Sequence, residues 1–263
     1  MTTDELRKHF LLETLFRPDT LDLTYWEVDR TIVGSAVPLG EGIPLVAPAE
    51  YLAADFFLER RELGVLNIGG RGRVEAGGKS YAMDRLDALY VGRGTRDVAF
   101  HSDDAGNPAR FFLVSYPAHA VHPAAHVPAT AGRQVALGAP EKANVRTICQ
   151  QIHEGSVPAC QLVMGHTTMS PGSVWNTFPP HPHLRLSEVY LYFDLPDDEA
   201  VFHFMGPGDA TRHLVVRSGQ AVLSPAWSIH SGCGTSAYRF IWAMGGENRR
   251  FDDMDPVPVT EIR

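Results

Sequence analysis

The sequence lacks the features that assign a protein to a specialised class. Its 263 residues include only 3 cysteines, which form no CxxC pair and, being odd in number, cannot all pair internally, so a reduced, cytoplasmic compartment is expected. No apolar run approaches the roughly 20 residues that cross a bilayer, and residues 1–16 lack the basic-then-apolar order of a signal peptide. The net charge of −8 comes without a basic stripe. Membrane and nucleic-acid partners are therefore not expected.

What is present is a globular composition, 44% apolar and 10% aromatic, with many strand-like segments. The length fits one large β-domain or two smaller modules. Short apolar runs between glycines recur after Pro48 and predict an all-β sandwich or barrel. The clearest of these strand predictions cover residues 62–69, 72–78, 87–92 and 110–116.

Other segments predict helix or irregular structure. A helix is expected over Asp4–Phe16, where leucines and phenylalanines recur at helical spacing until Pro18 ends the run. A second short helix is expected over Lys142–Ile152. Residues 117–140 contain four prolines and are typical of a linker or an irregular crossover, and the polar tail from Glu247 is expected to be irregular.

A weak internal repeat links the two β-rich regions. Residues 88–97 (ALYVGRGTRD) align with residues 221–230 (AVLSPAWSIH), and an arginine-led aromatic strand follows each, at Arg110 and at Arg239. Two unrelated β-hairpins can align this well by chance. The alternative is a duplicated barrel, in which Asp97 would take the position of His230.

The most informative segment is residues 179–193, PPHPHLRLSEVYLYF. Residues two apart on a strand share a face, so His181 and His183 can converge on one ion. Glu188 lies an odd number of positions from both, and a turn at Leu184–Ser187 that starts a second strand at Glu188 would bring it back. His230 can supply a fourth ligand. Three imidazoles and one carboxylate suit zinc, manganese, iron or nickel.

This pattern resembles the cupin superfamily, whose first motif supplies HxH and a glutamate and whose second supplies a histidine after a proline-led turn. Longer runs resemble one family within it, 5-keto-4-deoxyuronate isomerase. These runs span Phe56 to Asp255 and include residues 56–70 (FFLERRELGVLNIGG), 87–92 (DALYVG), 175–177 (WNT), 188–190 (EVY), 224–232 (SPAWSIHSG), 246–248 (GEN) and 251–255 (FDDMD). One departure is Pro182 between the two histidines, which removes a backbone donor there.

The resemblance implies a mostly β fold of duplicated cupin (double-stranded β-helix, jelly-roll) barrels with a few short helices. An N-terminal cupin-like barrel without a metal motif would span residues 1–130, and a C-terminal metal-binding barrel residues 131–263. By the same resemblance, the metal ligands are His181, His183, Glu188 and His230. They would hold one zinc ion per subunit, although another divalent first-row metal would also fit. The resemblance further implies a homohexamer.

The family's reaction converts 5-dehydro-4-deoxy-D-glucuronate to 3-deoxy-D-glycero-2,5-hexodiulosonate in pectin and polyuronide degradation. This aldose–ketose isomerisation moves a carbonyl from C1 to C2, and the weakly acidic proton on C2 is the obstacle. A metal that holds O1 and O2 would stabilise a cis-enediolate, and one base would carry the proton from C2 to C1.

Several residues are candidates for the remaining catalytic roles. Glu188 could carry the proton if it is not tightly bound to the metal; His203, His213 or Tyr190 could carry it otherwise. The substrate carboxylate needs a cation, and the candidates are Arg212, Arg185 and the Arg60/Arg61 pair. Each also has a plainer interpretation, as a strand residue with ordinary partners, as core packing or as a solvated cation. The spacing leaves these alternatives open.

Three other functions are compatible with the ligand set. Four protein ligands can close a purely structural zinc site. The same residues on a cupin can hold Fe(II) in a dioxygenase, which iron content and oxygen uptake would indicate. A bicupin can also bind or store sugars without catalysis, which sugar binding that survives chelation would indicate.

Overall fold

The computed structural model describes all 263 residues, which divide into two compact units. Unit 1 consists of Met1–Thr14, Arg133–Gln150 and Gly165–Arg263, and unit 2 consists of Leu15–Gly132 and Gln151–Met164. The sequence predicts one boundary, between residues 130 and 131; the structure places it after Gly132 and also assigns two longer segments, residues 1–14 and 151–164, to the other unit. Residues 1–14 belong to unit 1 because Leu11 and Leu12 pair with a strand there, and Cys160–Leu162 belong to unit 2 because their backbone N–H groups donate to Glu62.

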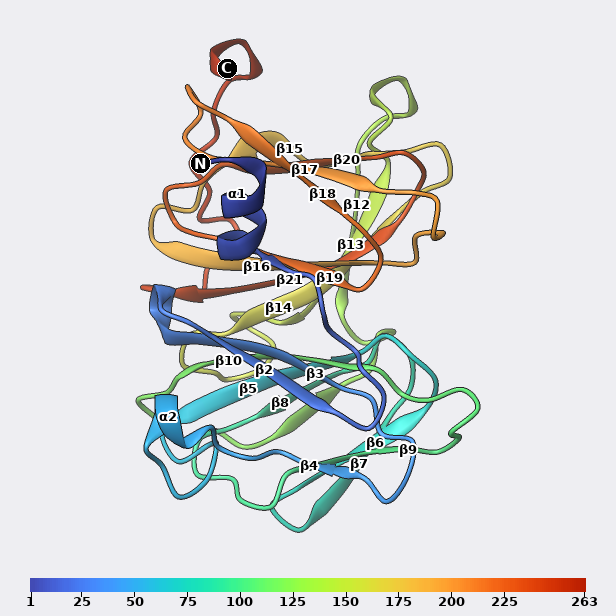
Figure 1. Ribbon diagram of the computed structural model, residues 1–263, viewed down its shortest axis with the longest axis vertical. Helices are drawn as coiled ribbons and strands as arrows, with labels where there is room; N and C mark the ends of the chain where they lie inside the picture. The colour runs from blue at the N-terminus through green and yellow to red at the C-terminus, as the bar shows by residue number, and fades with distance from the viewer. The chain divides into compact units, whose positions relative to one another are not determined.

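Unit 2 is built from ten strands, a short helix and a 3-10 turn. Its strands are β2 (Leu21–Trp26), β3 (Thr31–Ala36), β4 (Ile43–Pro44), β5 (Arg61–Asn67), β6 (Gly72–Ala76), β7 (Lys79–Met83), β8 (Ala88–Val91), β9 (Ala99–Ser102), β10 (Phe111–Pro117) and β11 (Ala125–Val127). The 3-10 turn is η1 (Val28–Arg30) and the helix is α2 (Ala49–Leu52). The strands form a six-stranded sheet, β11-β8-β5-β10-β3-β2, and a four-stranded sheet, β4-β9-β6-β7 (Figure 1).

Unit 1 has the same plan, with two residues of each of β13 and β14 assigned to unit 2. Its strands are β1 (Leu11–Leu12), β12 (Arg133–Leu137), β13 (Arg146–Ile152), β14 (Val163–Met169), β15 (Trp175–His181), β16 (Leu186–Phe193), β17 (Val201–Met205), β18 (Arg212–Val216), β19 (Gln220–Ser224), β20 (His230–Gly234) and β21 (Arg239–Gly246). Its helices are α1 (Thr3–Phe10), η2 (Pro140–Lys142) and η3 (Val259–Glu261). The sheet orders are β1-β19-β16-β21-β14-β13-β12 and β15-β20-β17-β18.

The matching sheet orders confirm the duplication and the predicted mostly β fold. The order β8-β5-β10-β3-β2 corresponds to β19-β16-β21-β14-β13, and β4-β9-β6-β7 corresponds to β15-β20-β17-β18. The ladder registers agree with the aligned sequences: Ala88 pairs with Leu66 as Ala221 pairs with Leu191. Likewise, Arg110 directly precedes β10 and Arg239 is the first residue of β21, the equivalent strand.

The proposed equivalence of Asp97 and His230 does not match the ladders. His230 pairs with the last residue of β15, and in unit 2 it is Ala99 that pairs with the last residue of β4. The connection between the preceding strand and this one is residues 92–98 in unit 2 and residues 225–229 in unit 1, two residues shorter. An ungapped alignment therefore shifts Asp97 onto the position that belongs to Ala99.

Of the two helix predictions, the first is correct at its start but too long, and the second is wrong. Helix α1 begins as expected, with a capping box between Thr2 and Glu5, but it ends at Phe10 because the next two residues pair with β19. The predicted helix over Lys142–Ile152 is wrong: Arg146–Ile152 is β13, paired with β12. Its β-branched residues suit a sheet, and strand pairing outweighs the local helical pattern. The predicted linker over residues 117–140 likewise contains β11 and β12.

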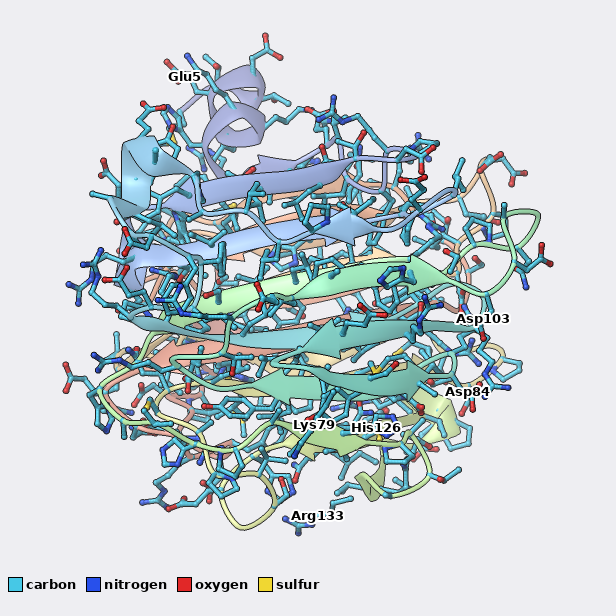
Figure 2. The ribbon with its side chains drawn as sticks, turned by 90° about the horizontal axis from the view of Figure 1, so that it is seen from below. Glu5, Lys79, Asp84, Asp103, His126 and Arg133 are labelled. Atoms are coloured by element: carbon cyan, nitrogen blue, oxygen red, sulfur yellow. The ribbon has the colours of Figure 1, made fainter.

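The two units bury apolar residues and keep most charges at the surface. The core of unit 2 includes Leu63, Val65 and Phe111 at nearly zero exposure. Acidic side chains project at the surface, and Figure 2 shows Asp84 and Asp103 at one edge, where Arg71 Nε lies 3.4 Å and 3.5 Å from their carboxylates. No helix is long and apolar enough to span a bilayer, and all three cysteines are free thiols.

Candidate metal centre

The four side chains expected to bind a metal lie together in unit 1. His181 ends β15, Glu188 is the third residue of β16, and His230 opens β20. The ligand nitrogens of His181, His183 and His230 lie within 4.8 Å of one another. Glu188 Oε2 lies 3.1 Å from Nε2 of His183 and 3.1 Å from Nε2 of His230. The chain leaves β15 at residue 182 and enters β16 at residue 186, so the break comes slightly earlier than predicted. His183 therefore lies in the connection and not on the strand of His181, and the expectation that the two histidines share a strand face is wrong.

Hydrogen bonds at the outer side of the cluster fix which ring nitrogens face its centre. His181 Nδ1 lies 2.9 Å from the carbonyl oxygen of Pro179, and His183 Nδ1 lies 2.6 Å from that of Asp253. A carbonyl oxygen only accepts, so each Nδ1 carries the proton and each Nε2 keeps its lone pair. His230 Nδ1 lies 3.3 Å from Ser224 Oγ. Outer contacts of this kind orient histidines that bind metals.

The cluster is buried and incompletely satisfied by the protein. Each of the four side chains is at most 8% exposed. Glu188 Oε2 and His230 Nε2 are buried without a hydrogen bond, although buried polar atoms normally have partners. One divalent cation would satisfy both atoms, and three imidazole nitrogens with one carboxylate oxygen fit such an ion.

Burial and mutual repulsion keep two of the histidines neutral. Burial, with the neighbouring His183, lowers the pKa of His181, and burial with His183 and His181 lowers the pKa of His230 well below its usual value. Burial also acts against the charged form of His183, but the adjacent Glu188 carboxylate outweighs it and raises that pKa. Neutral imidazoles are the form that binds metals.

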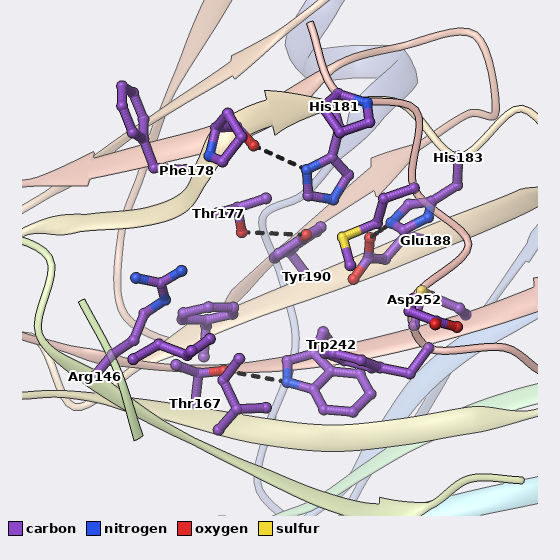
Figure 3. Close-up of a pocket in the computed structure, with 18 residues that line it drawn as sticks. Arg146, Thr167, Thr177, Phe178, His181, His183, Glu188, Tyr190, Trp242 and Asp252 are labelled. Atoms are coloured by element: carbon purple, nitrogen blue, oxygen red, sulfur yellow. Dashed lines mark hydrogen bonds and ion pairs between the residues drawn. The ribbon is translucent and has the colours of Figure 1, made fainter. Parts of the chain in front are cut away.

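Three members of the cluster, His181, His183 and Glu188, line a cavity of about 410 Å³ (Figure 3), a volume typical of small-molecule sites. Much of the remaining wall is apolar. It includes Phe178, Phe240, Trp242, Met244, Phe251 and Met254. The indole N–H of Trp242 donates to Thr167 Oγ1 at 3.2 Å. Gly165 makes room for this ring, because a Cβ there would lie 2.5 Å from Trp242 Cζ2.

Tyr190 is the candidate proton carrier that lines the cavity beside Glu188. Its hydroxyl lies 3.4 Å from Thr177 Oγ1. Burial and the nearby Glu188 raise the pKa of Tyr190 well above its usual value. The phenol therefore stays protonated and can donate a hydrogen bond into the cavity.

The structure does not bring the other two predicted carriers to the cavity. His203 is fully buried outside the lining, with its ring centroid 5.4 Å from that of Tyr190 and its Nδ1 2.8 Å from the Tyr192 hydroxyl. Burial lowers the pKa of His203 to about 3. His213 is exposed on β18, where its ring contacts Phe202.

None of the arginines predicted to bind the substrate carboxylate lines this cavity. Arg212 is exposed on β18 and donates to the carbonyl of Thr211. Arg60 and Arg61 belong to unit 2, where both line a different cavity of about 210 Å³. Arg185 is tied to acidic residues of the C-terminal tail.

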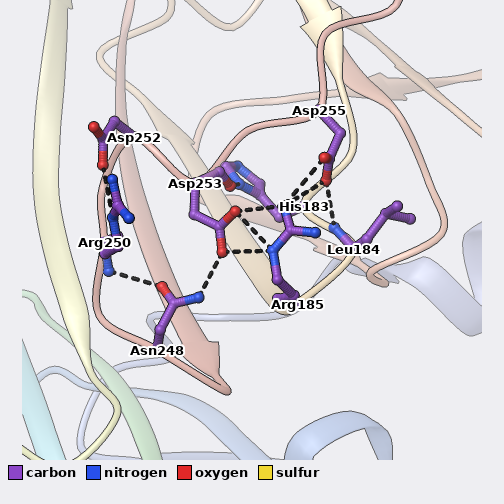
Figure 4. A network of polar contacts seen from close by, with 8 residues as sticks. All are labelled: His183, Leu184, Arg185, Asn248, Arg250, Asp252, Asp253 and Asp255. Carbon is purple, nitrogen blue, oxygen red and sulfur yellow. Dashed lines mark hydrogen bonds and ion pairs between the residues drawn. The ribbon is translucent and has the colours of Figure 1, made fainter.

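The tail network holds the outer side of His183 (Figure 4). Arg185 Nε donates to both carboxylate oxygens of Asp253 at 2.8 Å and 2.9 Å, and its Nη2 reaches Asp255 at 2.9 Å. The backbone oxygen of the same Asp253 accepts the His183 Nδ1 proton. The role of Arg185 is thus to position the tail against a ligand histidine. Residues 251–255 stood out in the sequence as an unusual run, but nothing in their spacing indicated this contact.

Arg146 is a cavity residue that the sequence interpretation missed. It is 8% exposed, it lines the cavity, and its Nη1 donates to the carbonyl of Asn144 at 2.9 Å. It was overlooked because its segment was predicted to be a helix next to a linker. An arginine among β-branched residues was the signal that could have found it.

Comparisons with known proteins give matches over most or all of the chain. A model of the KduI/IolB family matches residues 43–257. A 4-deoxy-L-threo-5-hexosulose-uronate ketol-isomerase of Halalkalibacterium halodurans is 49% identical over 262 residues, covering 100% of this chain and 95% of the relative. The protein of the same name in Opitutus terrae is 51% identical over 260 residues, covering 99% and 94%.

Solved structures support the fold alone. An IolB-like protein from Salmonella typhimurium superimposes with a TM-score of 0.78 at 14% identity, covering 94% of this chain and 96% of that one. A cupin 2 conserved barrel domain protein from Leptotrichia buccalis gives a TM-score of 0.52 at 10% identity, covering 89% and 95%. The predicted cupin-like fold is therefore confirmed.

Proposed function

The chain belongs to the KduI/IolB family, and from this premise we propose that it isomerises 4-deoxy-L-threo-5-hexosulose uronate (5-dehydro-4-deoxy-D-glucuronate), an open-chain sugar acid, to 3-deoxy-D-glycero-2,5-hexodiulosonate. Relatives at about half identity over the full chain carry the name of this ketol-isomerase. The dioxygenase and the non-catalytic sugar-binding protein are not favoured. The structural observation that carries the proposal is the convergence of three imidazoles with Glu188 Oε2 beside a cavity of small-molecule size, which His181, His183 and Glu188 line.

His181, His183, Glu188 and His230 would hold a divalent cation, which we take to be zinc, one per subunit. When bound, the ion supplies a Lewis acid beside the aldehyde and the neighbouring hydroxyl of the substrate. The opening of the cavity onto the cluster supports a catalytic site over a purely structural one. Elemental analysis of the purified protein tests the identity of the metal.

Glu188 is the residue best placed to move the proton. It contacts both imidazoles through one oxygen, Oε2, which leaves Oε1 to accept the proton from C2 and return it to C1. The C2–H bond breaks, a C1–H bond forms, and the hydroxyl proton of O2 moves to O1, so atoms balance. Tyr190, kept protonated by burial, donates a hydrogen bond to a substrate oxygen. The apolar wall limits water and so limits loss of the carried proton.

Turnover of the deoxyuronate, followed by NMR in deuterated water, tests this function. Wild-type protein with its metal is expected to form the ketose, and partial retention of the C2 hydrogen at C1 would indicate a single carrier. Glu188→Gln is expected to lose about 10²–10⁴-fold in kcat, while the exposed Arg212→Ala serves as control. Absence of isomerisation by the metal-loaded wild type would overturn the function, and full activity of Glu188→Gln would overturn only the carrier.

The remaining proposals concern the setting of the enzyme. We assign it to polyuronide (pectin) degradation in the cytoplasm, as a homohexamer. Three free cysteines are compatible with a reducing compartment. Light scattering checks the assembly, since a hexamer has six times the chain mass of 28.9 kDa.

A further inference from the structure

A buried guanidinium lies in the same cavity as the metal cluster. Arg146 on β13 is 8% exposed, and it is the one arginine or lysine among the residues that line the cavity. Figure 3 shows it on the other side of Thr177 and Tyr190 from His181 and His183. Its Nη1 donates to the backbone oxygen of Asn144. It forms no ion pair with an aspartate or glutamate.

A buried cation without a counter-ion is unfavourable. Desolvation of a guanidinium costs several kcal/mol unless a carboxylate or a set of hydrogen bonds replaces the water. Burial lowers the pKa of Arg146 from its usual value, and only the phenols of Tyr238 and Tyr190 act in the opposite direction. The protein satisfies one of the five N–H donors of this guanidinium with a carbonyl oxygen. The others are available to an anion in the cavity.

We propose that Arg146 binds the carboxylate of the sugar-acid substrate and thereby determines which end of the open chain reaches the histidine cluster. This inference rests on the proposed function. The planar fork of arginine matches a carboxylate with two parallel hydrogen bonds. With the acid end held at Arg146, the aldehyde end lies toward Glu188 and Tyr190. The same contact makes the site specific for uronates over neutral sugars.

The specificity follows from whether the bound sugar provides a counter-ion for the Arg146 guanidinium. A substrate that carries a hydroxymethyl group in place of the carboxylate would leave the guanidinium buried and without a counter-ion. Sites built around a buried polar contact reject analogues that lack it much more strongly than apolar pockets do. The expected discrimination resides in kcat/KM for the acid relative to the neutral analogue.

The test compares Arg146→Met and Arg146→Lys with wild type on two substrates, the deoxyuronate and its neutral C6-alcohol analogue. Arg146→Met is expected to lose about 10²–10³-fold in kcat/KM on the acid, mostly through KM, since breaking a buried charge pair costs several kcal/mol. Its activity on the neutral analogue should change less than about threefold. Arg146→Lys should recover part of the activity on the acid. Metal content should equal that of wild type, and Arg212→Met is the exposed control.

The outcomes separate the two proposals. If wild type does not isomerise the deoxyuronate, the proposed function is wrong. If wild type does so but Arg146→Met is unchanged, or loses equally on both substrates, Arg146 does not bind the carboxylate. If Arg146→Met does not fold, the wild-type protein alone still tests the inference. Its kcat/KM for the acid must exceed that for the neutral analogue by about 10²-fold or more. Equal kcat/KM values for the two substrates would contradict the inference.

Discussion

At the junction of β15 and β20, His181 pairs with His230; at the matching junction of β4 and β9 in unit 2, Pro44 pairs with Ala99. The register extends this comparison to the central strands. Glu188 pairs with Ser224 at the end of β19, and Leu63 pairs with Val91 at the end of β8. Leu63 belongs to the apolar core of its unit. One ladder thus accommodates either a hydrophobic core or a ring of ligands, and a few side chains decide which.

A second comparison involves two buried glutamates on equivalent central strands. Glu62 on β5 accepts backbone hydrogen bonds from Cys160, Gln161 and Leu162 at 2.6–2.8 Å and one from the Tyr90 hydroxyl at 2.8 Å. Glu188 on β16 leaves Oε2 without a hydrogen bond. A buried carboxylate that the protein satisfies fully stabilises the fold. One that it leaves unsatisfied beside three imidazoles is available to a ligand.

Removal of a ligand imidazole is expected to give the largest effect. His181→Ala and His230→Ala should each lose bound metal and at least about 10³-fold in activity together, because each removes a donor and leaves the remaining polar atoms buried. Metal analysis and turnover on the same preparations check this. His213→Ala, an exposed histidine of the same unit, should retain both. A metal-free variant with wild-type activity would contradict the catalytic role of the metal.

Leu63 and Glu188 occupy equivalent positions in the two units. Exchanging the residue types at these positions tests whether one ladder can hold either an apolar core or metal ligands. Leu63→Glu would bury a carboxylate among apolar side chains with no partner, and we expect it to lower the free energy of unfolding by about 3–5 kcal/mol. Glu188→Leu should abolish metal binding and leave the metal-free protein as stable as wild type or more stable, because it removes an unsatisfied buried group. Denaturant unfolding of both metal-free variants provides the measurement. If Leu63→Glu and Glu188→Leu lowered the free energy of unfolding equally, the proposed difference between the two positions would be wrong.

The same conservative change at the two glutamates gives a smaller effect on stability. Glu62→Gln replaces an acceptor by a donor that faces a backbone N–H, and it should cost about 1–3 kcal/mol in the free energy of unfolding while kcat stays near wild type. Glu188→Gln should do the reverse and reduce kcat with little change in the stability of the metal-free protein. Thermal melts and turnover assays of Glu62→Gln and Glu188→Gln show which of the two carboxylates stabilises the fold and which one supports catalysis.

The sequence was sufficient for the parts of the site that follow strand periodicity and motif spacing. His181, His183 and Glu188 could be grouped from the two-residue spacing of the histidines and a turn before the glutamate, although His183 lies just beyond the end of β15. His230 joined the set through its proline-led motif and the cupin resemblance. Glycine-bounded apolar runs likewise gave β5, β6, β8 and β10 close to their observed bounds.

The remaining parts depend on contacts between distant segments. Arg146 was hidden because the pairing of β13 with β12, separate in sequence by a loop, determines that its segment is a strand. Arg185 and Arg212 are both arginines near the motif. Arg185 binds Asp253 because the C-terminal tail passes beside it. Arg212 faces solvent because of where β18 lies in its sheet. Residue type and spacing contain no information about such packing.

The smallest effect is expected outside the repeated strands, at the tail that contacts His183. Arg185→Met removes the ion pairs to Asp253 and Asp255 and so frees the carbonyl that orients the His183 ring. Loss of such outer contacts typically weakens metal binding about 10–100-fold, with kcat at saturating metal close to wild type.

The hydrogen bonds from Arg185 lower the pKa of Asp253 from 3.8 to about 2. The pair therefore contributes fully above pH 3.8 and is lost only as the pH falls through about 2. The loss of affinity in Arg185→Met should consequently be the same at pH 6 and pH 8 in metal titrations. A loss confined to one of these pH values would show that the tail acts by changing the charge of the histidines rather than by positioning His183.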